Sequence, residues 1–284
     1  MIAIAVVTHN RVHLLRQCVD RVLCRTSPAT TEIVIWDNAS SSDTAHYLDS
    51  IEDPRVTVVH HGENIFQNAF ARAFARTSAQ YLVTLGDDIV DAPERWDETL
   101  MNAFDKLPSI AFLAADFADD EHDEMAELRY RVRPHAYSPF ELNGVPLLRG
   151  PTGSGCAITS REIYGRVGGF RQDSKGGFWF EDAAYIRDIR ELGYEAAILA
   201  ELKVRHAGGL YYAKPSAHKL AVIELQLREA RRKNAVKRAL LHMPLVPRLN
   251  AHYRWFAPPE KWWEEYLERQ ATSYRSALAS SSHA

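Results

Sequence analysis

The feature that most constrains this chain is the alternation of strand-like and helix-like segments over its first 90 residues. Short apolar runs alternate with longer segments in which apolar residues recur at helical spacing. The predicted strands are Ile2–Thr8, Glu32–Trp36, Arg55–His60 and a run that begins at Tyr81, and the predicted helices between them include Thr44–Ile51 and Asn64–Thr77. Such alternation predicts the α/β class, with a mostly parallel sheet flanked by helices.

Polar residues follow the predicted strands. Asp87 and Asp88 come after the run from Tyr81, which reads as a strand buried on both faces. His9-Asn10-Arg11 follows the first strand, and Asp37-Asn38 follows the second. Because parallel strands end at one edge of the sheet, we expect these groups to converge at the edge where open α/β sheets bind ligands.

The adjacent carboxylates of Asp87 and Asp88 repel each other and are costly to desolvate. A divalent cation offsets both effects, and hard oxygen ligands suit Mg²⁺ or Mn²⁺. A solvated turn after a strand is the alternative, and an isolated Asp pair is more often that. The chain has neither GxGxxG nor GxxxxGK[ST], so a metal rather than a glycine cradle is the expected way of holding phosphates.

Composition narrows the class of protein. The 284 residues suit one large α/β domain with an appendage, or two small domains. The net charge of −3 argues against nucleic acid as a general partner. Met1 leads directly into a strand and no apolar run is long enough to span a membrane, which predicts a cytoplasmic protein without a signal peptide or transmembrane segment. Cys18, Cys24 and Cys156 are expected as free thiols, the first two as helix packing residues.

The second half is less regular. The predicted elements are a helix over Trp96–Leu107, a buried strand over Ile110–Ala115, an edge strand over Leu128–Tyr137 and a short helix over Arg161–Val167. The acidic run Asp116–Glu127 is predicted to be a solvated loop or surface helix, because its spacing does not match a calcium loop. Gly150, Gly153 and Gly155 allow the backbone to approach a ligand closely or form a simple turn, and both interpretations stay open.

Two further groups could act chemically. Glu181 and Asp182 begin a predicted helix that runs to Leu192, directly after three aromatic residues. A helix N-terminus stabilises a carboxylate as the anion, which suits a general base, although either residue could simply cap the helix. His206 follows the predicted strand Glu195–Glu201 and suits a divalent ion, whereas a lone histidine is more often structural.

The C-terminal segment is predicted to be helical. Ser216–His242 reads as a long basic amphipathic helix, and Glu260–Leu278 as a second helix that leads into a disordered tail. The basic helix suits an anionic membrane surface or a partner subunit, and a solvated helix fits equally well.

Taken together, the ordered motifs resemble those of the family 2 glycosyltransferases, inverting enzymes of the GT-A fold. They are Val6–Arg11, Val34–Ser40, Asn64 with Asn68, Gly86–Asp88, Glu181–Asp182 and His206–Gly209. Each motif alone is a weak signal for the family, but the order of all of them over residues 2–212 is a specific one. The resemblance implies a Rossmann-like catalytic domain over residues 1–212, with a donor half of about 1–92 and an acceptor half of about 93–212. Residues 213–284 form a helical extension outside the resemblance.

The resemblance also implies the site. The donor would be a UDP-, dTDP- or GDP-linked sugar, and the acceptor a carbohydrate, lipid-linked or small-molecule hydroxyl. The implied nucleotide-sugar contacts are Thr8, Asn10, Arg11, Asp37, Asn64, Asn68, Asp87 and Gly153. Asp88 and His206 would hold Mn²⁺ or Mg²⁺. Asp182, with Glu181 beside it, would be the base that deprotonates the acceptor, and Phe178 and Trp179 would stack on a sugar or pack the core.

Two positions depart from the family pattern. Gly86 stands where Asp-x-Asp has its first Asp, which removes a ribose contact but keeps the metal-ligand position. Phe66 stands where the family has the glycine of Asn-x-Gly, so the bend there is expected to differ. The rival classes are a nucleotidyltransferase, a non-catalytic nucleotide-sugar-binding protein and a retaining transferase. Contact with the inner face of a membrane and a homodimer through the C-terminal helices are further expectations.

Overall fold

The computed structural model describes residues 1–171, 181–253, 256 and 258–281. The chain forms two compact units, Met1–Gly209 and Leu210–Ala284. No helix in the described part of the chain is long and apolar enough to cross a membrane.

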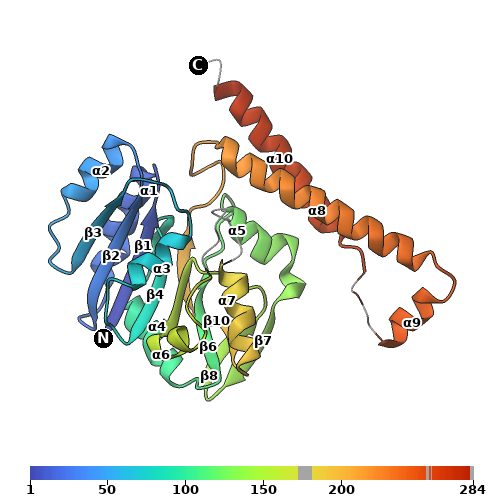
Figure 1. The fold of residues 1–284 in the computed structure, drawn as a ribbon, viewed down its shortest axis with the longest axis horizontal. Helices are drawn as coiled ribbons and strands as arrows, with labels where there is room; N and C mark the ends of the chain where they lie inside the picture. Colours follow the sequence, from blue (N-terminus) through green and yellow to red (C-terminus); the bar gives the residue numbers. More distant parts are fainter. Residues whose placement is uncertain (172–180, 254–255, 257, 282–284) are drawn as a thin grey trace. The chain divides into compact units, whose positions relative to one another are not determined.

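The first unit is built on a mixed ten-stranded sheet in the order β3-β2-β1-β4-β9-β6-β10-β8-β7, with β5 paired to β10 (Figure 1). The strands are β1 Ile2–Thr8, β2 Thr30–Asn38, β3 Val56–His61, β4 Tyr81–Gly86, β5 Ile89–Asp91, β6 Ile110–Phe117, β7 Ser138–Leu142, β8 Val145–Arg149, β9 Cys156–Ser160 and β10 Glu195–His206. The helices of this unit are α1 Val12–Arg21, α2 Ser42–Asp49, α3 Asn68–Phe74, α4 Trp96–Asp105, α5 Glu124–Ala126, α6 Arg161–Arg166 and α7 Glu181–Glu191. The predicted α/β class and the helix-flanked sheet are confirmed.

The register of the parallel strands aligns their polar ends. β1 pairs in parallel with β2 and β4, and β2 pairs in parallel with β3. Thr8 lies opposite Asp37, Asp37 lies opposite His60, and Val7 lies opposite Gly86. The residues after these strands therefore begin at one edge of the sheet.

Alternating strand residues supply two apolar layers, one on each face of the sheet. Ile4 and Val6 of β1 belong to one layer, which also contains apolar residues of α1, α2 and α4. Ala3 and Ala5 belong to the other layer, which contains apolar residues of α3 and α7. Small residues on the second face leave room for the aromatic side chains of these helices, including Phe70.

The second half departs from several expectations. The segment predicted as an edge strand forms instead a π-helix over Glu127–Val132 and a 3-10 turn over Pro134–Ala136. One edge of the sheet is formed by the hairpin of β7 and β8, whose turn residues Asn143 and Gly144 both have positive φ. Asn-Gly between two strands is a strong hairpin signal, so this turn was predictable from the sequence.

The acidic run was also predicted incorrectly in part. Asp116 and Asp123 are buried, with 2 % and 1 % of their surface exposed. Asp116 is neutralised by an ion pair with Lys203 and a weaker contact with Arg129 at 3.4 Å. Charge partners far away in the chain make this burial possible.

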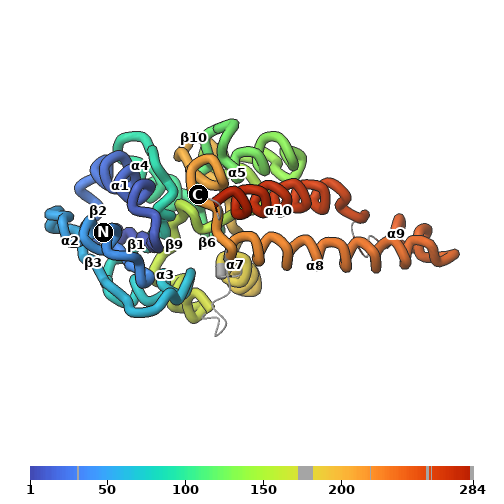
Figure 2. The backbone as a smooth tube through the Cα atoms, turned by 90° about the horizontal axis from the view of Figure 1, so that it is seen from above, coloured from blue at the N-terminus to red at the C-terminus, as the bar shows by residue number. Residues whose placement is uncertain are grey.

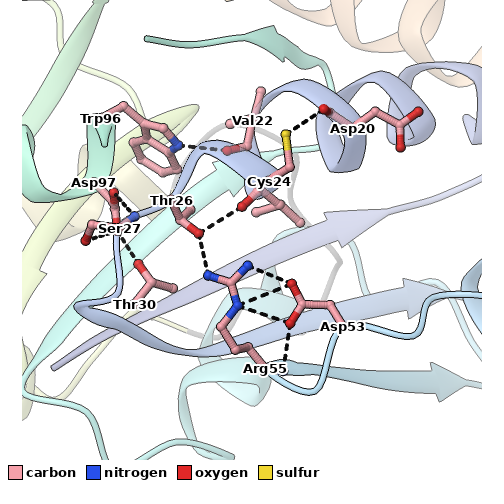
Figure 3. Close-up of polar contacts among 11 residues, drawn as sticks. Asp20, Val22, Cys24, Thr26, Ser27, Thr30, Asp53, Arg55, Trp96 and Asp97 are labelled. Carbon is pink, nitrogen blue, oxygen red and sulfur yellow. Dashed lines mark hydrogen bonds and ion pairs between the residues drawn. The ribbon is translucent and has the colours of Figure 1, made fainter. Parts of the chain in front are cut away.

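The amino-terminal edge of the sheet carries a separate polar cluster, drawn in Figure 3. Asp97 of α4 is fully buried and accepts hydrogen bonds from the Ser27 backbone N–H at 2.9 Å and the Ser27 hydroxyl at 3.1 Å. The hydroxyl of Thr30 also donates to it. Trp96 Nε1 donates to the Val22 carbonyl at 3.0 Å. This cluster anchors the entrance to β2 and gives a buried carboxylate a structural role.

The second unit is a helical hairpin. Its helices are α8 Ala217–Leu241, α9 Val246–Tyr253 and α10 Lys261–Ser281, and α8 and α10 run side by side in both views (Figures 1 and 2). Asn234 is buried and donates to Glu264 Oε1 at 2.6 Å, while Arg275 pairs with Glu224 at 3.0 Å. The predicted long helix is confirmed as α8, but it is only weakly amphipathic, because the apolar residues Leu225 and Val236 are exposed on it. Ser281, expected in a disordered tail, is the last residue of α10.

The three cysteines are free. Cys18 packs in α1 as expected, but Cys24 lies exposed in a 3-10 turn, where its thiol donates to the Asp20 carbonyl.

Candidate active site

Arg11 joins the end of β1 to the two carboxylates that follow β4. Its Nη1 donates to Asp88 Oδ2 at 2.8 Å, and its Nη2 forms an ion pair with Asp87 Oδ1. Asp87 is completely buried, whereas 17 % of the Asp88 side chain is exposed. The parallel register of β1 and β4 explains this contact between residues far apart in sequence.

His206, the last residue of β10, reaches the same carboxylate. Its Nε2 lies 3.6 Å from Asp88 Oδ2, and its Nδ1 forms a hydrogen bond with Asp123 Oδ1 at 2.6 Å. Asp123 also accepts from the backbone N–H groups of Gly208 at 2.9 Å and Ala126 at 2.7 Å. Because these backbone contacts hold the Asp123 carboxylate, it fixes the imidazole with Nε2 toward Asp88.

Burial and charge oppose each other at these groups. Burial raises the pKa of the Asp87 carboxyl, against the effect of Arg11. Burial would raise the pKa of Asp88 too, but Arg11 and His206 outweigh it and hold that pKa well below its usual range. Burial disfavours the charged form of His206, yet Asp88 and Asp123 raise its pKa to about 10. At neutral pH Asp88 is therefore an anion with two cationic neighbours.

Two glycines leave room for these side chains. A Cβ at Gly86 would lie 2.4 Å from Asp88 Oδ1, and a Cβ at Gly208 would lie 2.4 Å from His206 Cε1. Cβ contacts under 3.0 Å are essentially never seen in proteins. An aspartate at position 86 would therefore displace Asp88 from its contacts with Arg11 and His206.

The loops after β1 and β2 are bonded to each other. The Asn10 backbone N–H donates to Ser40 Oγ at 3.0 Å, and Asn10 Oδ1 accepts from the Ser41 N–H at 2.6 Å. Asn10 has φ of 55°, a left-handed conformation that asparagine adopts more readily than most residues. Its side chain therefore holds the loop at the edge of the sheet.

Asp37 lies at the same edge, but its carboxylate is used within the fold. It is buried, accepts from the Ser40 N–H at 2.9 Å and bonds His60 Nδ1 at 2.8 Å. The bond with Asp37 raises the pKa of His60. Nearby, the Thr8 hydroxyl is buried without a hydrogen-bond partner within the described chain.

Asn64 and Asn68 lie in the connection from β3 into α3. Asn64 Oδ1 accepts from the Phe66 N–H at 2.9 Å, and Asn68 is the first residue of α3. Asn38 clamps the same connection, since it donates to the Phe66 carbonyl at 3.0 Å and accepts from the Ile65 N–H at 3.3 Å. Phe66 has φ of 52°. The bend is thus made in the left-handed region without a glycine.

Asp182 lies in the first turn of α7, beside the glycine-rich segment that precedes β9. It accepts from the Ala183 N–H at 2.6 Å, and the Ser154 N–H is a second backbone donor. A Cβ at Gly153 would lie 3.6 Å from Asp182 Oδ2. Burial raises the pKa of Asp182, although the backbone donors oppose the shift.

The same glycine-rich segment is bonded to the strand of the Asp pair. The Gly86 N–H donates to the Gly155 carbonyl at 2.8 Å. Residues 153–155 therefore connect the surroundings of Asp182 with the end of β4. The side chain of Glu181 and the predicted aromatics Phe178 and Trp179 lie outside the described parts of the structure.

With this geometry established, comparison with known proteins identifies the family. The model of glycosyl transferase family 2 matches residues 3–168, which is more than half of the chain and includes β1–β4 and the Asp pair. The chain belongs to glycosyl transferase family 2. Comparison with curated proteins gave no match.

Two solved structures share the GT-A fold of this family 2 glycosyltransferase. The mannosyltransferase PcManGT from Pyrobaculum calidifontis, in complex with GDP-Man and Mn²⁺, is 19 % identical with a TM-score of 0.52, and the match covers 100 % of this chain and 75 % of that chain. S. aureus TarS 1–349 is 12 % identical with a TM-score of 0.54, and the match covers 81 % of this chain and 65 % of that chain. At these identities the likeness concerns the fold.

The donor set of this family 2 glycosyltransferase fits a divalent ion that is shared with a ligand. Within the described residues, no group of three or more His, Cys, Asp or Glu side chains is placed to hold a metal by itself. Asp88 offers an oxygen donor, and His206 offers a nitrogen donor once a metal displaces its Nε2 proton. Asp87 Oδ2 is buried without a hydrogen-bond partner in the described chain. Magnesium-type ions are commonly bound by one or two carboxylates together with substrate phosphates and water.

Sequence reasoning missed two residues that hold this site. The sequence predicts Asp123 in a solvated acidic run and His60 only as the end of a strand. Asp123 precedes a short helix and caps it, a local signal that was available. Its contact with His206 joins residues 83 positions apart, and no local pattern contains that contact.

Proposed function

We propose that this family 2 member is an inverting glycosyltransferase that moves a sugar from a nucleotide-sugar donor to an acceptor hydroxyl with the help of a divalent metal. The observation that carries the proposal is that Asp88 and Asp182, whose surroundings are connected by residues 153–155, have pKa values shifted in opposite directions. Asp88 is held as an anion by Arg11 and His206, while burial raises the pKa of Asp182. Such a separation of pKa values suits one carboxylate for binding cations and the other for taking up a proton.

The proposed reaction forms one bond, breaks one bond and transfers one proton. The acceptor oxygen forms a bond to the anomeric carbon from the side opposite the diphosphate, and the bond from that carbon to the diphosphate oxygen breaks. The nucleotide diphosphate leaves with the bonding electron pair, and Asp182 takes the acceptor proton. Positioned base catalysis typically contributes about 10²–10⁴-fold.

Asp88 and His206 would hold the metal, which when bound supplies positive charge to the leaving diphosphate. Three residues of this chain keep Asp88 and His206 in position for the metal. Arg11 keeps Asp88 ionised, Asp123 orients His206, and Gly86 leaves room for the Asp88 carboxylate. The Mn²⁺ and GDP-Man in the Pyrobaculum structure support a nucleotide-sugar donor and Mn²⁺ for this chain as well.

We further propose that residues 1–212 carry donor and acceptor sites, with Thr8, Asn10, Asn64 and Asn68 near the donor. The acceptor is a carbohydrate, lipid-linked or small-molecule hydroxyl. A homodimer through the C-terminal helices is a separate proposal, and sedimentation velocity over a range of protein concentrations tests it.

The decisive experiment is Asp182→Asn in an assay of nucleotide diphosphate release from UDP-, dTDP- and GDP-sugars with Mn²⁺. We expect turnover to fall by about 10²–10⁴-fold, with nucleotide diphosphate affinity unchanged in calorimetry. Glu191→Gln is the matched control, because it changes a carboxylate to an amide at the exposed opposite end of α7. Turnover of Asp182→Asn near that of the control would refute the assignment, and NMR of the product anomer tests inversion.

A further inference from the structure

The connection between α8 and α10 exposes an unusual amount of apolar surface. Met243, Leu245, Leu249 and Tyr253 are 52 %, 65 %, 38 % and 60 % exposed, and we call these four residues the apolar tip. Leu245, Leu249 and Tyr253 are four residues apart, which places them along one side of a helix. Three of the four lie within or directly beside α9, which follows α8 in Figure 2.

α9 buries none of its described residues. It is eight residues long, and isolated helices of this length are marginal in water. Helices in proteins are stabilised mainly by packing of an apolar face. Within the described residues of the hairpin, the apolar side of α9 is therefore left without an apolar environment.

The chain segment that contains the apolar tip carries charges of one sign only. Residues 230–259 contain seven Lys or Arg and no Asp or Glu, in a chain whose net charge is −3. Arg231 and Arg238 pair with glutamates of α10, and Lys233 lies 3.7 Å from Glu229 of α8. Arg248 lies in α9 itself, is exposed, and forms no ion pair with any described residue.

We propose that α9 docks on an anionic lipid surface, with the apolar tip inserted at the headgroup boundary and the surrounding cations against the lipid phosphates. A short helix with one apolar side and a basic polar side is the usual form of such an interfacial contact. A second copy of the chain fits the apolar tip less well, because a two-fold interface would place this patch against itself and bring its cations together. The homodimer proposed above would use other surfaces of the C-terminal helices. The inference stands independently of the transferase reaction.

The test is flotation of the full-length protein with vesicles, without donor or acceptor. Vesicles of phosphatidylcholine alone are compared with vesicles that also contain phosphatidylglycerol. We expect binding to the anionic vesicles, at least about tenfold weaker binding to the neutral ones, and loss of binding in high salt, because surface attraction is screened by ions.

Leu245→Ser/Leu249→Ser should lower binding to the anionic vesicles about tenfold or more. Leu225→Ser is the matched control, since Leu225 is 49 % exposed on α8 outside the apolar tip and should have no effect. Circular dichroism and thermal unfolding report whether each variant is folded.

Equal binding by the folded double variant and the control would overturn the proposal, as would equal binding to neutral and anionic vesicles. Concentration-dependent dimerisation without vesicles that the double variant abolishes would assign the apolar tip to a second copy and also overturn it. Since the assay contains no sugar donor, its failure would leave the transferase proposal intact.

Discussion

Replacing Gly86 with alanine should weaken nucleotide diphosphate binding without unfolding the protein. The added Cβ would lie 2.4 Å from Asp88 Oδ1, whereas real contacts of this kind keep at least 3.0 Å, so the carboxylate must move by about 0.6 Å. Asp88 is the end of a side chain and can rotate, so the fold should tolerate the change. What is lost is the position of Asp88 relative to Arg11 and His206.

The magnitude follows from those contacts. The Arg11–Asp88 bond of 2.8 Å is a hydrogen bond between charged groups. Such bonds contribute about 1.5–3 kcal/mol, so losing the one that positions Asp88 would weaken the Kd by at most about 10- to 150-fold. Because Arg11 also pairs with Asp87 and would keep that contact, we expect a loss near the lower end of this range. Gly86→Asp should be at least as damaging, although it restores the Asp-x-Asp of the family.

The assay is calorimetry with UDP and GDP in the presence of Mn²⁺, accompanied by thermal unfolding. Gly165→Ala is the matched control, because nothing lies within 4 Å of the added Cβ and alanine is favoured inside α6. The reasoning fails if Gly86→Ala binds like the control, or if Gly86→Asp binds more tightly than the natural chain.

Three further predictions concern strain, burial and pH. Ala39 has φ of 58°, so Ala39→Gly should raise the free energy of unfolding by up to about 1 kcal/mol. The control Ala45→Gly, inside α2, should lower it by about 1 kcal/mol. Urea unfolding measures both, and a lower free energy of unfolding for Ala39→Gly would show that the backbone at Ala39 is not strained. Asp97→Ala leaves three buried hydrogen-bond donors without their acceptor and should lower the free energy of unfolding by at least about 3 kcal/mol, with the KM for the sugar donor unchanged. A urea midpoint equal to that of the natural chain would exclude a structural role for Asp97. Burial raises the pKa of Asp182 from its usual 3.8, and a base must be deprotonated, so kcat should fall as the pH drops through that raised pKa; an acid limb that persists in Asp182→Asn belongs to another group.

Local patterns account for the part of the fold that the sequence predicted. The segment Ile2–Thr8 is an uninterrupted apolar run, and the structure gives β1 the same bounds. The predicted helix over Asn64–Thr77 is shorter in the structure, from Asn68 to Phe74, because Asn64 and Asn38 hold the preceding residues in a bend. Side-chain hydrogen bonds to the backbone compete with the helix at this point.

Long-range contacts account for what the sequence analysis missed. Alternation over residues 128–137 is typical of a strand, yet this segment coils into a π-helix that contributes Arg129 and Tyr130 to the surroundings of Asp116. A period of two predicts a strand only where a neighbouring strand offers its hydrogen bonds. The edge beside β8 is filled by β7 instead.

The sequence by itself determined the order of strands and helices along the first half, the polar residues at the strand ends and the family to which the chain belongs. The first two depend on the spacing of residues close together in the chain, and the third on the order of short motifs along it. Only the tertiary structure decided that Asp123 orients His206, that Asp37 is bonded to His60, and that residues 153–155 join the surroundings of Asp182 to β4. Those contacts unite residues from separate elements, and their free energy depends on burial and on charge partners that the folded chain alone assembles.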